Sequence, residues 1–262
     1  MSSQKESTLR TLTVALVVCL VCSIFVAGGA IALKPVQVEN RLLDKQRSIL
    51  AIAGLGEEGM SAQQVKSMFA ERIIPRVVDL NSGQFTDELD PLLFDQLKSA
   101  KDPQLSAALA GTEDIASIKR RERFATVYLV ENQGKLDRLI LPVRGYGLWS
   151  TLYGFLALEG DLNTVVGFGF YQHGETPGLG GEVDNPSWKA LWKGKTLFDA
   201  NGALAVEIIK GAVDPGSAKA VHQVDGLAGA TLTSNGVNNL LHFWLGKSGF
   251  GPFLANLGKG EA

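Results

Sequence analysis

Cysteine is nearly absent from this chain. The two cysteines, Cys19 and Cys22, both lie in one hydrophobic segment near the N-terminus. The rest of the chain therefore has no disulfide, no thiolate metal site and no cysteine nucleophile. The Cys-x-x-Cys spacing fits a redox or metal motif, but small apolar side chains in a lipid-facing helix explain it more simply.

The sequence also has no large excess of positively or negatively charged residues. Lys and Arg number 25 against 27 Asp and Glu, and the two signs are intermixed without a basic run. Nothing in this pattern favours nucleic acid as a partner. The sequence shows no nucleophile–base pair, no metal-ligand cluster and no Gly-x-Gly-x-x-Gly after a strand. We therefore assign no catalytic residue and no metal ligand, and a free-standing enzyme or NADH binding by this chain is disfavoured.

One long hydrophobic run is present. Thr11–Leu33 carries no charge and is bounded by Arg10 and Lys34. About 23 residues at 1.5 Å each span a hydrocarbon core of ~30 Å, so we predict a transmembrane helix at 11–33 after a tail at 1–10. A cleaved signal peptide is the alternative. The count of basic residues on the two sides leans weakly against a cytoplasmic tail, whereas a long domain after such an anchor usually translocates regardless of charge.

Beyond the anchor, the pattern of apolar residues predicts an α+β fold. Residues 34–114 combine helical spacing with turn signals and are predicted to form a membrane-proximal helical and irregular region. Strands are predicted at 124–130, 136–143, 153–158, 164–171 and 204–209, with a turn at 132–134 between the first two and a short extended piece at 77–80. Helices are predicted at 40–55, 61–73, 186–192 and 232–245, the second of them capped by Ser61. We expect an antiparallel sheet with flanking helices over 115–250, followed by a C-terminal tail at 251–262.

Glycine, at 30 residues, is abundant and clusters in three segments of the second half. These segments are Arg144–Tyr153, His173–Gly181 and Asp225–Ser234. Each borders a predicted strand or helix and mixes glycine with an aromatic, hydroxyl or acidic residue. Such segments are typical of a site built from backbone amides and a flat apolar slot.

The third segment leads directly into the helix predicted at 232–245. The hydroxyl of Thr231 would then lie near the free amides of Leu232, Thr233 and Ser234. A phosphate at this position gains amide hydrogen bonds and the helix dipole. Ordinary N-capping by threonine is the alternative explanation of the same residues.

The motifs in these segments resemble a known family. Residues 225–231, DGLAGAT, resemble the Asp-Gly-x-x-Gly-Ala-Thr target motif of periplasmic flavin transferases, which join FMN through its phosphate to the last threonine. Ala228 departs from this motif, because the family usually has Ser or Thr there. HGETPGLG at 173–180 and GYGLWSTLYGFLAL at 145–158 resemble the FMN-binding domain of the C subunit of the sodium-translocating NADH:quinone reductase. NRLLDKQRSILAIAGL at 40–55 is similar to that protein rather than to the shorter G subunit of the Rnf complex.

The resemblance implies FMN held by a phosphoester to Thr231. The other candidate cofactor-binding residues are Asp225, Gly229, Ala230, Leu232 and Thr233 around the helix start, Leu148, Trp149, Pro177 and Leu179 as apolar walls, Glu175, Thr176, Gly178 and Gly180 as further contacts, and Lys210 as a cation for the phosphate. His173 is expected to be a hydrogen-bonding turn residue. Three tryptophans are expected to lie in the core or a lid: Trp188, Trp192 and Trp244.

The resemblance also implies a function. The chain is expected to be an electron-carrying subunit of a sodium-pumping NADH:ubiquinone reductase, single-pass in the inner membrane with its large domain in the periplasm. Expected partners are the other membrane subunits, a flavin transferase during maturation, and membrane lipid. The predicted anchor has no acid, so sodium is expected to pass through other subunits. Two alternatives remain open: the G subunit of an Rnf-type complex, and a membrane-anchored binding or sensory module that holds FMN noncovalently.

Overall fold

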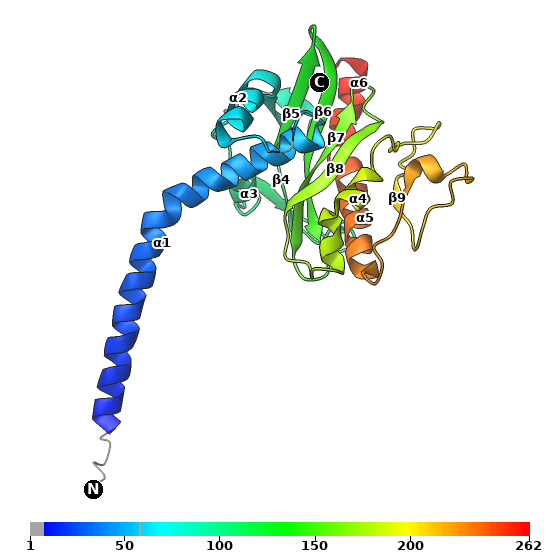
Figure 1. The fold of residues 1–262 in the computed structure, drawn as a ribbon. Coiled ribbons are helices and arrows are strands. Elements are labelled where there is room, and N and C mark those ends of the chain that lie inside the picture. Colours follow the sequence, from blue (N-terminus) through cyan, green and yellow to red (C-terminus); the bar gives the residue numbers. More distant parts are fainter. Residues whose placement is uncertain (1–7, 58) are drawn as a thin grey trace. The chain divides into compact units, whose positions relative to one another are not determined.

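The computed structural model describes residues 8–57 and 59–262, which form two compact units divided between Asp44 and Lys45 (Figure 1). The first unit holds most of α1 (Thr8–Ile52), a 45-residue helix. By length and composition α1 is able to cross a membrane, and none of its most apolar stretch is buried. The helices predicted separately at 11–33 and 40–55 are thus one helix that continues through Pro35. Proline inside a helix removes one N–H donor, and its ring crowds the carbonyl four residues earlier, which typically kinks the helix without ending it.

A six-stranded antiparallel sheet forms the centre of the second unit. Its strand order is β2-β1-β5-β6-β7-β8. The strands are β1 (Ile74–Asp79), β2 (Gln84–Thr86), β5 (Phe124–Asn132), β6 (Lys135–Tyr146), β7 (Thr151–Glu159) and β8 (Val165–Gln172). The four strands predicted between 124 and 171 are confirmed. By contrast, β1 and β2 come from the region predicted to be helical and irregular, where only a short extended piece at 77–80 was expected, and they extend the sheet beyond β5.

The hairpin between β5 and β6 has the expected tight turn. Gln133 and Gly134 adopt φ angles of 52° and 75°. Positive φ at both central residues is the geometry that matches the twist of two antiparallel strands.

Shorter elements complete the unit. They are the strand pair β3 (Ser106–Ala108) and β4 (Arg120–Glu122), the parallel pair β9 (Glu207–Ile208) and β10 (Gln223–Val224), the helices α3 (Gln96–Ser99) and α4 (Pro186–Ala190), and the 3-10 turns η1 (Gly180–Asp184) and η2 (Ala220–His222). The strand predicted at 204–209 is therefore limited to two residues. The helix predicted at 186–192 ends earlier, at Ala190.

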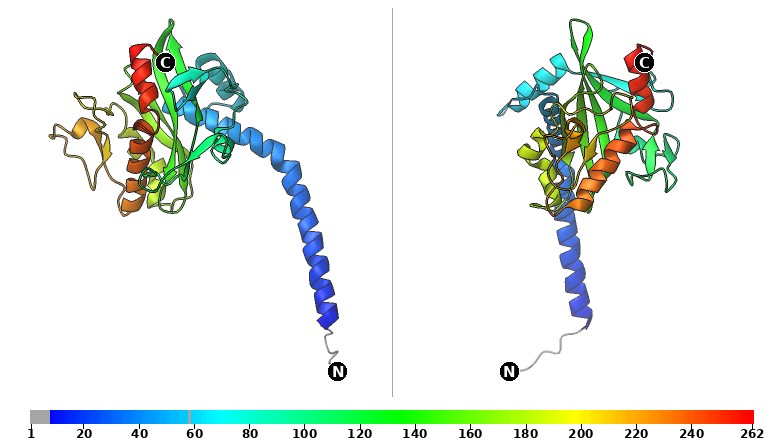
Figure 2. Two further views of the ribbon diagram at one scale, coloured as in Figure 1. Left: turned by 180° about the vertical axis from the view of Figure 1, so that it is seen from behind. Right: turned by 90° about the vertical axis from the view of Figure 1, so that its right-hand side faces the viewer.

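Both faces of the sheet are covered. On one face, Leu139, Leu141 and Val143 of β6 join a buried cluster with α5 (Thr231–Leu245) and α6 (Gly251–Lys259) (Figure 2). The opposite face carries Tyr128, whose ring meets the edge of Phe69 on α2 (Ala62–Arg72).

The last turns of α1 belong to this second unit and lie against the same face. The ammonium of Lys45 lies 5.6 Å from the centre of the Tyr128 ring. A Cβ on Gly167 of β8 would lie 2.5 Å from the carbonyl oxygen of Ile52. Glycine at 167 therefore allows the helix end to approach the strand.

The start of α2 agrees with the sequence. The Ser61 hydroxyl accepts the Gln64 amide at 3.3 Å, and the Gln64 side chain accepts the Ser61 amide at 2.9 Å. This reciprocal capping box fixes the first turn of the helix.

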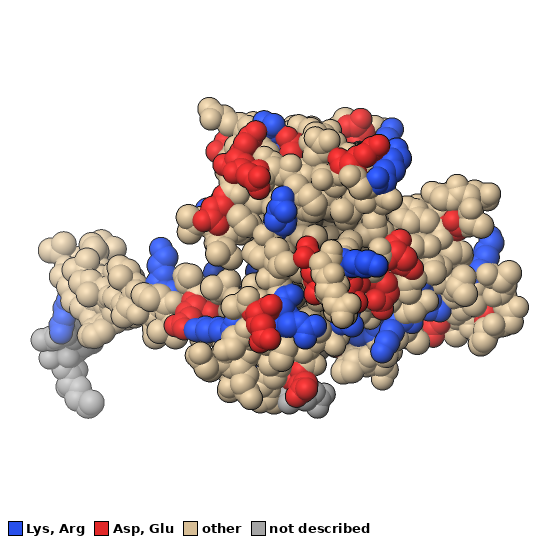
Figure 3. Space-filling view, turned by 90° about the horizontal axis from the view of Figure 1, so that it is seen from above, with Lys and Arg blue, Asp and Glu red and all other residues tan. Residues whose placement is uncertain are grey.

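Charged side chains of both signs are interspersed over the face drawn in Figure 3, in keeping with the net charge of −2.

Residues 251–262, expected to be a tail, contain α6. Phe253 is fully buried and Leu254 is 6% exposed. The Phe253 ring meets the edge of Phe85 on β2, with ring centres 5.1 Å apart. The end of the chain is thus part of the core. Its contacts join positions more than 160 residues apart, and the Asn256 side chain likewise donates to the Gly83 carbonyl.

Because Phe253 is fully buried, its truncation should destabilise the protein. We expect Phe253→Ala to lower the free energy of unfolding by about 3 kcal/mol, through lost burial and a residual cavity. Denaturant unfolding of the solubilised protein measures the change, with the exposed Lys259→Ala on the same helix as control. Equal stability of the two variants would show that α6 does not belong to the core.

Candidate functional site

The three glycine-rich segments meet at the side chain of Glu175, which is 5% exposed. Its Oε1 accepts the backbone amides of Trp149 at 2.9 Å and Ser150 at 3.1 Å, and the Leu148 amide lies 3.2 Å from both carboxylate oxygens. Its Oε2 accepts the hydroxyl of Thr233 at 2.8 Å. A single carboxylate from the second segment therefore binds the first and third segments together.

Two glycines make this junction possible. A Cβ on Gly147 would lie 2.7 Å from the Glu175 Oε1. A Cβ on Gly180 would lie 2.5 Å from the Thr233 Oγ1 and 2.7 Å from the Glu175 Oε2. Side-chain carbons do not approach oxygen this closely, so glycine at both positions is needed for the carboxylate to reach its donors.

The same contacts keep Glu175 ionised. Burial by itself raises the pKa of this carboxyl group, but the hydrogen bonds from the Trp149 amide, the Thr233 hydroxyl and the Leu148 and Ser150 amides outweigh it. The pKa of Glu175 is therefore lowered from its usual value of 4.5. The charge is compensated by oriented donors rather than by an opposite ion.

His173 takes part in the turn that leads to Glu175. Its Nδ1 accepts the Glu175 amide at 3.2 Å, and its Nε2 lies 2.7 Å from the Oδ2 of Asp184. Lys189 lies 3.0 Å from the other oxygen of Asp184. Both ring nitrogens are therefore engaged in local hydrogen bonds, as expected for a turn residue.

Thr231 is the first residue inside α5, and Ala230 takes the N-cap position without a side-chain hydrogen bond. The helix therefore begins one residue before the predicted start at 232, and Thr231 lies next to its N-cap, as expected. The Ser234 amide, expected to be free, donates to the Ala230 carbonyl at 3.0 Å. In the described residues, the amides of Thr231, Leu232 and Thr233 have no hydrogen-bond acceptor. A helix start leaves such amides available to an anion, and the Thr231 side chain beside them is exposed.

The turn before Thr231 is held by its neighbours on both sides. Gly229 has a φ of 70°, which only glycine adopts without strain, and its Cβ position lies 3.1 Å from the Leu179 side chain. The Leu227 amide donates to the Ser234 hydroxyl at 3.1 Å. The second and third segments are therefore adjacent at this turn.

Asp225, the first residue of the motif, is anchored on its other side. Its carboxylate accepts the Val213 amide at 2.8 Å, and its carbonyl accepts the indole N–H of Trp188 at 2.9 Å. The Gly226 amide donates to the Gly211 carbonyl at 2.9 Å. Asp225 therefore fixes the loop rather than presenting a free charge.

An apolar rim surrounds the junction, with side chains from all three segments. The exposed fractions are 38% for Leu148, 65% for Trp149, 46% for Leu179 and 60% for Leu232. Thr176, Pro177 and Gly178 are also exposed. Four large apolar side chains exposed near one helix start are typical of a ligand site rather than of an ordinary surface.

Lys210 lies two residues beyond β9 and is exposed. Its neighbour Gly211 bonds to Gly226, which places this stretch beside the start of the motif. The tryptophans expected in the core are there: Trp188 is 6% exposed, and Trp192 and Trp244 are fully buried.

The roles of two residues near the junction were not predicted. Ser150 donates its amide to Glu175, and its hydroxyl accepts the Gly174 amide at 2.7 Å. Ser234 closes the turn before the helix. Both are short polar residues inside glycine-rich segments, and this is the only sequence feature that indicated a role for them. Their hydrogen-bond partners lie in another segment or across a turn, so the sequence did not identify them.

Comparison with known proteins gives consistent results. A family model described as the FMN-binding domain matches residues 147–246, which contain all three segments except the first few residues of the first one. The chain is 78% identical over 260 residues to the C subunit of the Na(+)-translocating NADH-quinone reductase of Pseudomonas aeruginosa, covering 99% of this chain and 100% of that one. It is 51% identical to the corresponding protein of Yersinia pestis, covering 96% and 93% of the two chains.

Two crystal structures are also similar. The structure of NqrC from Shewanella oneidensis has a TM-score of 0.74 and 39% identity, and the match covers 82% of this chain and 96% of that one. The structure of the same reductase's C subunit from Parabacteroides distasonis has a TM-score of 0.64 and 29% identity, covering 85% and 96%. The predicted fold class, an N-terminal apolar helix followed by an antiparallel-sheet domain with helices, is confirmed.

Replacing Glu175 should weaken the junction and change its response to acid. Because the folded pKa lies below the unfolded one, the ionised carboxylate contributes stability above pH 4.5 that is lost as the pH falls through the folded pKa. Glu175→Gln places an amide donor among amide donors. We expect a loss of about 2 kcal/mol at pH 7 and a shallower decline in acid. Denaturant unfolding at several pH values measures both effects, with the exposed Glu131→Gln as control. An unchanged acid limb would rule out this role.

Proposed function

The chain belongs to the NqrC family, the C subunits of the Na(+)-translocating NADH-quinone reductase, and on this basis we propose that it carries electrons within a sodium-pumping respiratory complex. Its FMN-binding domain supplies the redox chemistry, because flavins accept and release electrons, and the protein sets the position and electrostatic surroundings of the cofactor. The relatives and solved structures above all belong to the NqrC family, which favours it over the G subunit of an Rnf-type complex.

We propose that FMN is esterified through its phosphate to Thr231. The carrying observation is an exposed hydroxyl at the first residue of α5, inside the flavin transferase motif, followed by amides that have no acceptor in the described residues. A phosphodiester keeps one negative charge, which the amides of Leu232 and Thr233 and the helix dipole stabilise. The residues present therefore fit the group, and Ala228 in place of Ser or Thr leaves the acceptor itself unchanged.

The remaining candidate residues divide into two tasks. Leu148, Trp149, Pro177 and Leu179 offer apolar surface to the flat ring, and Thr176 offers an exposed hydroxyl. Glu175 is committed to amide and hydroxyl donors and acts by holding the segments together.

The backbone of the motif shapes the approach to the phosphate. Asp225, Gly229 and Ala230 fix the turn before the helix. In the second segment, Gly178 supplies a turn with a φ of 75°, and Gly180 allows the backbone to approach the Thr233 hydroxyl. Lys210 offers a cation from the neighbouring loop.

The proposed setting is the inner membrane, with α1 as the anchor and the large unit in the periplasm. Other subunits of the reductase are its partners, a flavin transferase attaches the FMN, and lipid surrounds α1. A covalent bond suits this compartment, because a diffusing cofactor would be lost from it. Sodium passes through other subunits, since the apolar stretch 11–33 carries no acid.

Thr231→Ala should abolish covalent FMN while sparing the fold. The side chain is exposed and makes no capping hydrogen bond, so the free energy of unfolding should change by less than about 0.5 kcal/mol. After co-expression with a flavin transferase, intact-mass analysis and in-gel fluorescence of denatured protein report the attachment. Thr231→Ser should retain the flavin, and Thr176→Ala is the matched exposed-hydroxyl control. Covalent FMN in Thr231→Ala would refute the assignment. Release of all flavin from the denatured parent would instead support noncovalent binding.

The proposed orientation is testable because Cys19 and Cys22, both inside the anchor, are the chain's two cysteines. We expect a cysteine in place of the exposed Glu131 to react with a membrane-impermeant maleimide in intact spheroplasts. The parent chain serves as the background control. Labelling that appears only after the inner membrane is disrupted would place the large unit in the cytoplasm.

A further inference from the structure

A hollow of about 510 Å³ lies in the part of the second unit between β2 and β3, on elements other than the three glycine-rich segments. We name it the acidic hollow. Its lining consists of Glu88, Leu89, Asp90, Leu93, Phe94, Asp95, Lys98, Ser99, Asp102 and Leu105. Apolar side chains thus alternate with carboxylates around one concave surface.

The charge of the acidic hollow is strongly one-sided. It has four carboxylates and one lysine, and Lys98 lies 3.1 Å from the Asp95 carboxylate. Among the described residues, Glu88, Asp90 and Asp102 form no ion pair. Within residues 8–57 and 59–262, the carboxylate of Asp90 accepts the Leu92 amide and that of Asp102 accepts the Gln104 amide, with no further donor to either. A net negative charge therefore remains for a ligand to meet.

Two large apolar side chains are exposed here. Leu93 lines the hollow and is 83% exposed, and its neighbour in the chain, Leu92, is 76% exposed. Their turn is fixed, because the Asp90 carboxylate accepts the Leu92 amide at 2.8 Å and the Asp90 carbonyl accepts the Phe94 amide at 2.9 Å. The Phe94 ring meets the edge of Phe124, with ring centres 6.5 Å apart. The two leucines are thus presented outward by a turn that is anchored in the core.

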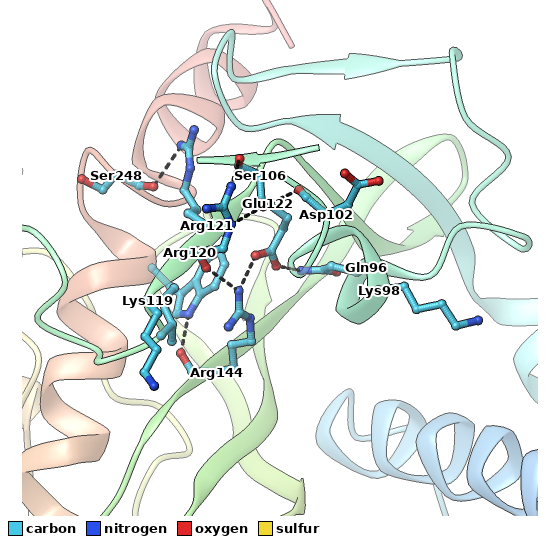
Figure 4. Close-up of polar contacts among 12 residues, drawn as sticks. Gln96, Lys98, Asp102, Ser106, Lys119, Arg120, Arg121, Glu122, Arg144 and Ser248 are labelled. Carbon is cyan, nitrogen blue, oxygen red and sulfur yellow. Dashed lines mark hydrogen bonds and ion pairs between the residues drawn. The ribbon is translucent and has the colours of Figure 1, made fainter. Parts of the chain in front are cut away.

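Buried polar contacts tie this surface to the central sheet (Figure 4). On α3, the Gln96 side chain donates to Glu122 at 2.7 Å, and Glu122 is fully buried. Arg144 of β6 donates to the other oxygen of Glu122 at 2.6 Å, and its carbonyl accepts the indole N–H of Trp244 at 2.7 Å. In Figure 4, the Lys98 side chain extends away from the Arg144–Glu122 ion pair. The wall of the hollow is therefore preorganised, and it is connected to the strand that ends beside Gly147.

We propose that the acidic hollow docks a cationic segment of another subunit of the complex, in which Lys or Arg flanks an apolar residue. The carboxylates supply charge complementarity, and the leucines supply the apolar contact area. Anionic lipid is the less favourable occupant, because its headgroups would be repelled by the unpaired carboxylates. The proposal rests on the membership of a multisubunit reductase proposed above.

Co-purification of the complex through a tag on this chain tests the proposal. Leu92→Ser with Leu93→Ser should reduce the recovered partner subunits about tenfold, because exposed apolar anchors carry much of such interfaces. Glu88→Gln with Asp90→Asn and Asp102→Asn keeps the local acceptors but removes the charge. At low salt, this variant should recover about tenfold fewer partner subunits than the parent. At about 0.5 M salt, where charges are screened, its recovery should differ little from that of the parent.

Matched controls keep the result specific. Glu71→Gln with Glu113→Gln and Glu131→Gln removes three exposed carboxylates elsewhere, and Val221→Ser removes an apolar side chain that is 52% exposed. Both should recover the partners within about twofold of the parent. Parental recovery by both hollow variants overturns the proposal.

A photocrosslinking phenylalanine in place of Leu93, in the purified complex, identifies the occupant. A crosslink to a partner segment that has Lys or Arg next to the attached residue supports the proposal. A crosslink to lipid, to a second copy of this chain, or to no other chain overturns it. Covalent FMN is measured on the same samples. Lost assembly of the hollow variants with parental FMN content supports the hollow, and parental assembly with parental FMN content overturns it while leaving the Thr231 proposal intact. Absence of covalent FMN from the parent complex itself counts against Thr231 and does not bear on the hollow.

Discussion

The carboxylate of Glu175 accepts donors from two distant parts of the chain at once, and the geometry of the site depends on this junction. The Trp149 amide lies 26 residues before it and the Thr233 hydroxyl 58 residues after it. A buried charge of this kind is stable only when oriented donors replace the water that it loses. The glycines at 147 and 180 are consequences of the same requirement, since side chains there would separate the carboxylate from its donors.

The junction determines what surrounds the start of α5. It fixes the turn at Thr233, two residues after the threonine proposed to carry FMN. It also fixes the backbone of Leu148 and Trp149, whose exposed side chains form the apolar rim with Leu179 and Leu232. The amides at the start of α5 and the exposed apolar side chains of the rim are therefore held together by one carboxylate.

The central sheet connects this site to the rest of the second unit. Arg144 belongs to β6, which ends at Tyr146 next to the junction, and its side chain binds the buried Glu122 behind the acidic hollow. On the opposite face of the sheet, the last turns of α1 pack beside β8, the strand that precedes Glu175. A close-packed interior has low compressibility, so these parts are held at fixed positions, which suits the proposed role in electron transfer.

The sequence alone determined the features that arise from neighbouring residues: the apolar run of α1, the hairpin at Gln133 and Gly134, the capping box at Ser61, and the motif that ends at Thr231. These depend on local hydrogen bonds and on the periodicity of apolar side chains, which one segment contains in full. Tertiary structure decided the rest. The pairing of β1 with β5, the burial of Phe253, and the partners of Glu175 and Glu122 each join residues far apart in the chain. No local pattern encodes which distant donor meets a buried carboxylate, because that is fixed only when the sheet and helices pack.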